Sequence, residues 1–285
     1  MTKLRRMREL LASARPLLSP GAFDGYSLRL VEAMGYESAS TSGAGLANSL
    51  LGQPDIGILS LSQNVDACRH LARSVSIPLM ADADTGYGNA VTVYHVVQYF
   101  EEAGVVGINL EDQVMPKRCG HFARKQVVST GEMLARIRAA VRARSNPDFT
   151  LFARTDARAV HGLDDAIDRV NRFGDAGADV AFIEAPQSVA ELELIPRRVA
   201  RPLLANMLTG GVTPILSVAE LDQLGYKLAV APIESLLVTA RAVRDLCTAW
   251  QTKGRVDDLS AAAMSFAELK KLLGVETFTA PQDKP

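Results

Sequence analysis

Residues 77–112 read IPLMADADTGYGNAVTVYHVVQYFEEAGVVGINLED and contain a complete strand–helix–strand unit. The apolar runs at 77–84 and 106–112 are short and continuous, which is typical of parallel strands covered on both faces. Between them, the segment 90–104 has the apolar spacing of an amphipathic helix and ends in glycine, a signal for a helix C-terminus. This stretch predicts two neighbouring parallel strands joined by a helix.

The same unit recurs on both sides of this stretch. The candidate strands are the apolar runs at 16–24, 37–43, 77–84, 106–112, 149–157, 179–186, 201–207 and 227–233. This repeated alternation of strand and helix favours a closed (β/α)₈ barrel of the TIM type over an open doubly wound sheet. We therefore expect a single barrel domain over 1–285, with a short N-terminal helix and a C-terminal helical tail.

Composition narrows the classes of function. The formal charge is −1, charges of both signs are spread along the chain, and aromatic residues make up only 6%. These features give no reason to expect a nucleic acid or another polyanion as partner, and no apolar run has membrane-spanning length. Three widely spaced cysteines indicate no disulfide framework. We expect a cytoplasmic protein that acts on a small molecule.

Polar residues follow nearly every candidate strand. They are Asp24, Ser42, Asp82, Asp84, Glu111, Asp112, Arg154, Asp156, Glu184 and Asn206. One acidic residue after a strand is commonly a helix cap, but that explanation does not cover so many successive strands. In a (β/α)₈ barrel the carboxyl ends of the strands share one rim, where active sites lie. The pattern therefore predicts an active site at that rim.

A metal site is expected among the acidic side chains of this rim. Asp82, Asp84 and Glu111 lie in or at the end of apolar runs, and Asp55 in GQPDIG can reach the same place. Buried carboxylates need a counter-charge. An all-oxygen set without His or Cys favours Mg²⁺ over zinc, with Mn²⁺ as a possible substitute. We expect Asp82 to bind the ion directly and the others to bind partly through water.

The segment PKRCGHF at 116–122 follows the fourth strand and is the second candidate feature. Cys119 has Lys117, Arg118 and His121 as neighbours, which predicts a lowered thiol pKa, and Gly120 permits close approach of a ligand. The alternative is a surface loop with an incidental cysteine. Cys68 and Cys247 lie in amphipathic helical patterns, so we expect both in the core.

The third feature is TSGAG at 41–45, which comes directly after the second strand. Consecutive small residues present backbone N–H groups to an anion, here a substrate carboxylate. A glycine-rich turn alone is weak evidence, but its position at a strand end strengthens it.

With these residues in view, the sequence resembles the isocitrate lyase / phosphoenolpyruvate mutase superfamily over nearly its whole length. The motifs that carry the resemblance are SGAG, GQPDIG, ADADTGYGN, GINLEDQV, PKRCGHF, FARTDA, FIEAP and LLANM. The sequence is most similar to the short lyases and mutases, which include methylisocitrate lyase, 2,3-dimethylmalate lyase and carboxyphosphonoenolpyruvate mutase.

The resemblance implies a barrel whose last helix is exchanged between subunits of a homotetramer, a dimer of dimers. It implies Mg²⁺ held through Asp82, with Asp55, Asp84 and Glu111 in the outer set. For the substrate, it implies a carboxylate site at Ser42, Gly43 and Ala44. Arg154 would bind a carboxylate or oxygen of the substrate, His121, Glu184 and Asn206 would line the far end, and the loop around Cys119 would close over the site.

The implied reaction is cleavage of the C2–C3 bond of a substituted 2-hydroxy dicarboxylate, with Cys119 as general acid and Arg154, Lys117 and His121 stabilising negative charge. Two differences from methylisocitrate lyases count against a tricarboxylate substrate. Ser40 replaces a tyrosine of methylisocitrate lyases, and Leu237 stands in the place of an arginine, although Arg241 is near. The alternatives are a phosphonomutase, a methylisocitrate lyase and an oxaloacetate decarboxylase. Another alternative is a barrel subunit without catalytic activity. It is disfavoured because the sequence keeps all of the expected residues of the metal site and of the loop around Cys119.

Overall fold

A parallel sheet forms the centre of the computed structural model, which describes residues 1–255 and 263–279. Its strands within these residues are β1 (Leu17–Pro20), β2 (Ala39–Ser40), β3 (Leu79–Asp82), β4 (Gly107–Glu111), β5 (Thr150–Thr155), β6 (Val180–Ile183), β7 (Leu203–Asn206) and β8 (Leu228–Ala231). Each strand lies inside one of the eight apolar runs, so the predicted strands are confirmed.

The sheet closes on itself. The strand order is β1-β8-β7-β6-β5-β4-β3-β2, and every strand pair is parallel. A bridge between Gly21 and Ser40, with a 2.9 Å hydrogen bond from the Ala22 N–H to the Ser40 carbonyl, joins the ends of β1 and β2. The predicted (β/α)₈ barrel is therefore confirmed.

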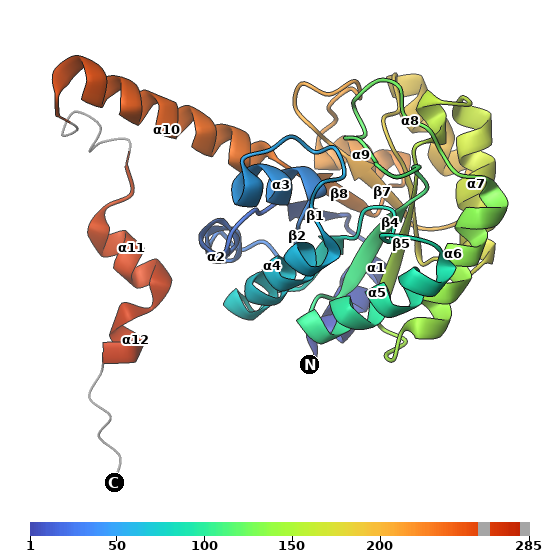
Figure 1. The fold of residues 1–285 in the computed structure, drawn as a ribbon, viewed down its shortest axis with the longest axis horizontal. Coiled ribbons are helices and arrows are strands. Elements are labelled where there is room, and N and C mark those ends of the chain that lie inside the picture. The colour runs from blue at the N-terminus through green and yellow to red at the C-terminus, as the bar shows by residue number, and fades with distance from the viewer. Residues whose placement is uncertain (256–262, 280–285) are drawn as a thin grey trace, which may run out of the picture.

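Helices alternate with the strands and surround the barrel (Figure 1). They are α2 (Gly25–Ala33), α3 (Gly43–Leu51), α4 (Leu61–Ser74), α5 (Ala90–Ala103), α6 (Thr130–Ala143), α7 (Leu163–Asp175), α8 (Val189–Arg198) and α9 (Val218–Leu224), with a 3₁₀ turn η1 (Ala157–Ala159). Gly104 ends α5 with a φ of 88°, a left-handed conformation that favours glycine, as the sequence predicts. No helix in the described part of the chain is long and apolar enough to cross a membrane.

Helix α1 (Lys3–Ala12) closes the amino-terminal end of the barrel. Its buried Met7, Leu10 and Leu11 join the apolar cluster inside the strands. Arg8 donates to the carbonyls of 147–149 just before β5, and Lys3 donates to two carbonyls just before β3. The barrel interior is therefore accessible from the opposite, carboxyl end.

The last helices leave the barrel (Figure 1). The long helix α10 (Glu234–Lys253) projects outward with no buried residue, and α11 (Phe266–Leu273) and α12 (Val275–Thr279) follow it. Helix α11 touches α2 through a 3.1 Å hydrogen bond from Arg29 to the Leu272 carbonyl. The expectation that Cys247 lies in the core is wrong, because Cys247 is exposed on α10; Cys68 is fully buried, as expected.

Candidate active site

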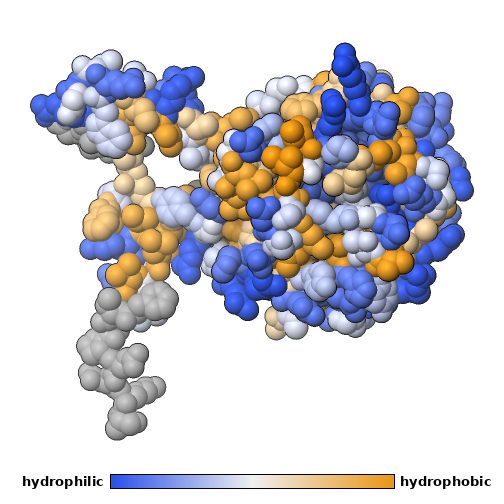
Figure 2. Space-filling view, in the orientation of Figure 1, coloured by the Kyte–Doolittle hydropathy of each residue, from blue (hydrophilic) through white to orange (hydrophobic). Residues whose placement is uncertain are grey.

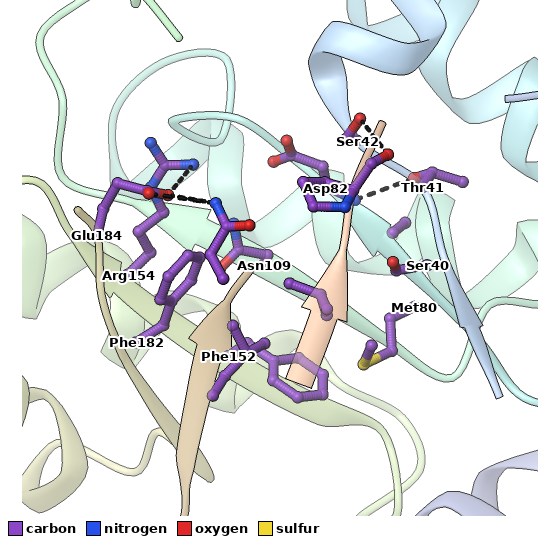
Figure 3. A pocket seen from close by; sticks show the side chains of 15 residues that line it. Ser40, Thr41, Ser42, Met80, Asp82, Asn109, Phe152, Arg154, Phe182 and Glu184 are labelled. Carbon is purple, nitrogen blue, oxygen red and sulfur yellow. Dashed lines mark hydrogen bonds and ion pairs between the residues drawn. The ribbon is translucent and has the colours of Figure 1, made fainter. Parts of the chain in front are cut away.

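A pocket of about 80 Å³ opens at the carboxyl ends of the strands (Figure 3). Its floor is apolar and its rim polar. The floor comes from Met80, Ala81, Phe152, Phe182, Leu204 and Val230, and the rim includes Ser40, Thr41, Ser42, Asp82, Asn109, Arg154, Glu184 and Asn206. Figure 3 shows Asp82 and Ser42 on one side of the pocket and Arg154 and Glu184 on the other. Asp24 lies outside it and caps α2, because its side chain accepts the Ser27 N–H.

The predicted metal ligands gather on the Asp82 side. Asp82 ends β3 and accepts the N–H groups of Gly43, at 2.9 Å, and Asp84, at 3.1 Å. The Lys117 ammonium lies between Asp55 and Asp84, at 2.5 and 2.7 Å from their carboxylate oxygens. Lys117 is 3% exposed, so its charge offsets part of the repulsion among the acids.

Glu111 leaves room for a further cation. Both of its carboxylate oxygens are buried and accept no hydrogen bond from the residues that the structure describes, although Arg154 lies 3.2 Å away. Burial raises the pKa of Glu111 well above its usual range, and burial also raises the pKa of Asp84 to about 6 despite Lys117. Carboxylates in this state are stabilised by a nearby divalent ion.

These oxygen donors fit Mg²⁺ bound mainly through water. Within residues 1–255 and 263–279, no three His, Cys, Asp or Glu side chains are arranged to ligate a metal ion together. Mg²⁺ usually keeps several waters and takes only one or two carboxylates directly. Asp82 lies in the pocket, so it is the acid best placed for direct contact.

The predicted carboxylate site is the first turn of α3. Ser42 is the N-cap of this helix, and its hydroxyl accepts the Gly45 N–H at 2.9 Å. A Cβ at Gly43 would lie 2.8 Å from both Asp84 Oδ1 and Lys117 Nζ, so a larger residue there would displace the charged ends of these side chains. Gly43 and Ala44 begin the helix, whose N-terminus favours an anion, and the Gly43 N–H already donates to Asp82.

The segment 113–127, which we call the gate loop, lies against the rim of the pocket. Its two ends pair through an antiparallel bridge between Gln113 and Val127. Nearer its tip, the Cys119 N–H donates to the Asp55 carbonyl at 3.2 Å, and Lys117 and His121 reach the acids of the rim. The loop thus occupies a closed position over the site.

The predicted lowering of the Cys119 pKa is wrong. Burial raises the pKa of this thiol, and the charges of Asp55 and Glu184 act in the same direction. The ammonium of Lys117, two residues before Cys119, is paired with Asp55 and Asp84. The thiol is therefore held in its protonated form.

A second charged cluster lies across the pocket, around Arg154. Its guanidinium binds Asp156 at 2.8 Å and lies 3.3 Å from Glu184. Burial alone would raise the pKa of Glu184, but Arg154 and His121 outweigh it and lower that pKa to about 2. Glu184 also contacts His121 at 3.2 Å and accepts from Asn206 at 3.2 Å. The side chains of Arg154, His121, Glu184 and Asn206 therefore lie together on one side of the pocket.

Sequence reasoning missed several residues of this site. Asn109 lines the pocket, and its buried side-chain amide oxygen, Oδ1, accepts no hydrogen bond within the described residues. It lies two positions before Glu111 on β4, so strand alternation could have identified it. Tyr87 and Asn64 support the acids from behind, since the Tyr87 hydroxyl lies 3.3 Å from Asp84 and 2.8 Å from Asn64. No motif singles out Asn64.

Comparison with known proteins agrees with this geometry. The family model for phosphoenolpyruvate phosphomutase matches residues 7–251. The chain belongs to this family. It is 41% identical to the 2,3-dimethylmalate lyase of Eubacterium barkeri, over 97% of this chain and 96% of that protein. The resemblance to the isocitrate lyase / phosphoenolpyruvate mutase superfamily and the prediction of a lyase of this superfamily are confirmed.

Two solved structures of family members are also similar. Oxaloacetate acetylhydrolase in complex with 3,3-difluorooxalacetate has a TM-score of 0.93 at 33% identity, covering 97% of this chain and 95% of that one. Phosphonopyruvate hydrolase in complex with oxalate and Mg²⁺ has a TM-score of 0.88 at 31% identity, covering 98% and 97%. The family thus includes several reactions on one fold.

Proposed function

We propose that this enzyme cleaves the C2–C3 bond of a substituted 2-hydroxy dicarboxylate, such as 2,3-dimethylmalate, to pyruvate and a carboxylic acid. The observation that carries the proposal is the 41% identity to 2,3-dimethylmalate lyase over nearly all of both chains. The pocket supports it, because a polar rim with cations lies above an apolar floor that suits alkyl substituents.

We propose that Mg²⁺ is the cofactor, with Mn²⁺ as a possible substitute, held by Asp82 and, partly through water, by Asp55, Asp84 and Glu111. When bound, the ion supplies Lewis acidity at the 2-oxygen of the substrate. A relative of known structure was solved with Mg²⁺. The buried carboxylate of Glu111, whose oxygens accept no hydrogen bond within the described residues, supports a cation at this place.

The chain's own residues supply the remaining chemistry. The first turn of α3, at Ser42, Gly43 and Ala44, orients a substrate carboxylate at the N-terminus of the helix. Arg154 stabilises the negative charge that develops when the C2–C3 bond breaks, and Lys117 and His121 add positive charge at the rim.

Proton transfer is the role of Cys119. Its thiol is kept protonated by burial, so it can donate a proton to the carbanion left on C3 as general acid. The closed gate loop, with Gly120 packed against Arg154 and Glu184, excludes bulk water while this happens. Glu184 and Asn206 hold the far end of the pocket.

The test is pyruvate release from 2,3-dimethylmalate by the purified protein with Mg²⁺, followed through lactate dehydrogenase. We expect turnover with this acid. Release of oxalate from oxaloacetate, decarboxylation of oxaloacetate or rearrangement of a phosphonate, without turnover of any 2-hydroxy dicarboxylate, would assign the chain to another reaction of the family.

We further propose that the enzyme works in the cytoplasm as a homotetramer, a dimer of dimers in which α10 is exchanged between subunits. The support is the exposure of this helix, on which Leu237, Val238, Val243 and Trp250 are all more than 40% exposed. Figure 2 shows apolar side chains along the arm formed by α10 and α11. Apolar surface of this kind is typical of an interface.

A further inference from the structure

Lys125 is a buried lysine on the gate loop. Its side chain is 1% exposed, and its ammonium donates both to the Gly120 carbonyl and, at 2.6 Å, to Asp156. Lys125 belongs to the returning arm of the loop, whose neighbour Gln126 accepts the Val114 N–H at 2.9 Å. The side chain therefore reaches from the fixed base of the loop to its tip and to the barrel.

The partner of Lys125 also holds the substrate-binding arginine. Asp156 follows β5 and is fully buried. It accepts the Arg154 Nε–H at 2.8 Å and the Nη2–H at 3.0 Å, while its own N–H donates to Asp112 at 2.9 Å. A bidentate carboxylate fixes the plane of a guanidinium. The orientation of Arg154 and the position of Lys125 therefore depend on the same carboxylate.

The loop tip rests directly on the same cluster. A Cβ at Gly120 would lie 2.5 Å from Glu184 Cγ and 2.6 Å from Arg154 Nη2, which only glycine avoids. The Gly120 carbonyl that Lys125 binds therefore belongs to a residue that packs tightly against the rim of the pocket. A small outward movement of the loop at Gly120 would break the hydrogen bond between the Gly120 carbonyl and Lys125, and the same movement would expose Arg154.

We propose that Lys125 is a positioning residue that latches the gate loop closed and links closure to the orientation of Arg154 through Asp156. The kinetic part of this inference rests on the proposed lyase function; the structural part does not. Because the substrate binds first to the open form, loss of the latch should act on the closure step, and so on kcat more than on KM.

The structural part is tested by alkylation of Cys119 with iodoacetamide in a Cys247→Ser background, where the fully buried Cys68 stays unreactive. Lys125→Met should speed the labelling of Cys119 about tenfold or more, the change that ~1.4 kcal/mol in the closing equilibrium produces. Lys125→Arg keeps the charge but cannot make both ammonium contacts. Its Cys119 should therefore be labelled faster than that of the wild type and more slowly than that of Lys125→Met. If Lys125→Met does not fold, a rate above wild type for Lys125→Arg still supports the latch.

The matched control is Lys3→Met. The Lys3 ammonium also donates to two carbonyls, each at 2.6 Å, but at the opposite end of the barrel. The Lys3→Met change should therefore leave the rate of Cys119 labelling unchanged. Wild-type labelling rates in both Lys125 variants would overturn the latch, as would equal acceleration by Lys3→Met, which would indicate general loosening.

Steady-state kinetics with 2,3-dimethylmalate then test the link to Arg154. Lys125→Met should lower kcat about tenfold or more with KM nearly unchanged, and Lys125→Arg should restore part of kcat. A rise in KM alone would overturn the proposed link. If the wild type does not turn over any 2-hydroxy dicarboxylate, the proposed function fails, whereas the labelling result still decides the latch.

Discussion

Burial keeps the Cys119 thiol protonated, and a proton donor must be in that form at the moment of reaction. Cys119→Ala should therefore lower kcat by about 10²–10⁴, the usual contribution of a general acid, while leaving the protein folded. Cys247→Ala is the control, because Cys247 lies exposed on α10 far from the pocket, and it should keep wild-type kcat. Similar losses in both variants would remove Cys119 from the mechanism.

Removal of the divalent ion should abolish turnover. Dialysis against EDTA is expected to inactivate the enzyme, and Mg²⁺ or Mn²⁺ should restore it. Asp82→Ala should lose more activity than Asp84→Ala, because Asp82 lines the pocket whereas Asp84 is bound to Lys117. Isothermal titration with Mg²⁺ gives a readout besides activity. Full turnover in protein shown to be metal-free by elemental analysis would contradict the assignment.

For single residues, the sequence predicted which residues belong to the site, but it did not predict which side chains they contact. The strand-end acids, Arg154 and Glu184 lie where the repeat of strand and helix places them. The place of Lys117 among the acids and the burial of Cys119 depend on how the gate loop folds back, and no local pattern encodes that. The pKa error followed directly, because neighbours in sequence were treated as neighbours in space.

Among the elements, η1 and α8 are joined by an ion pair that should depend on pH. Arg158 donates to Glu191 at 2.9 Å, and this hydrogen bond lowers the pKa of Glu191 below 4.5. A lowered folded-state pKa stabilises the protein above the unfolded value and loses that contribution as pH falls through the folded value. Glu191→Gln should thus lower Tm at neutral pH. The loss in the free energy of unfolding should be no more than about 1 kcal/mol.

The difference in Tm between Glu191→Gln and wild type should shrink toward zero in melts recorded at acidic pH, below that folded value. Glu193, exposed on the same helix, provides the control: Glu193→Gln should match the wild type at every pH. A difference in Tm for Glu191→Gln that stays constant with pH would rule out the ion pair as its cause.

The projecting helix α10 tests the proposed assembly. Val243→Glu combined with Trp250→Glu places two charges on its apolar surface, and both residues are about half exposed in a single chain. If this surface is covered by another subunit, the variant should elute as a smaller species in size-exclusion chromatography with light scattering. Gln251→Glu, on the same helix, should keep the wild-type mass. A monomeric wild type would refute the tetramer.

Elements were predictable to different degrees for a physical reason. Strands of a parallel barrel are buried on both faces, so their apolar runs are unambiguous in the sequence. The sequence of an amphipathic helix such as α10 indicates that one face packs against other protein. The pattern does not indicate whether that protein is the same chain or another subunit. Cys247 was therefore assigned to a core that this chain alone does not provide.

For the molecule as a whole, the small pocket with its apolar floor predicts the choice of substrate. A third carboxylate needs a cation, yet Arg154 and Lys117 are already paired and Arg241 binds Asp245 at 2.8 Å on α10. Leaving that carboxylate unpaired in a closed site costs several kcal/mol. 2,3-Dimethylmalate should therefore exceed methylisocitrate in kcat/KM by about tenfold or more.

Side-by-side measurement of kcat/KM for the two acids decides this preference, and Leu237→Arg should narrow it by supplying a cation at the first turns of α10. Leu237→Met, which keeps an apolar side chain of similar volume, is the control and should retain the wild-type ratio. A wild type that favours methylisocitrate would show that a cation outside the described contacts serves the third carboxylate.

The seal that α1 forms across the amino-terminal end of the barrel has a consequence for the order of events. With Met7, Leu10 and Leu11 filling that end, the described residues leave the pocket open at the carboxyl end of the barrel. Cleavage of one substrate gives two products, and we expect the product nearer the floor to leave after the other. Product inhibition should then show ordered release, and in the reverse direction the last product to leave should be the first to bind.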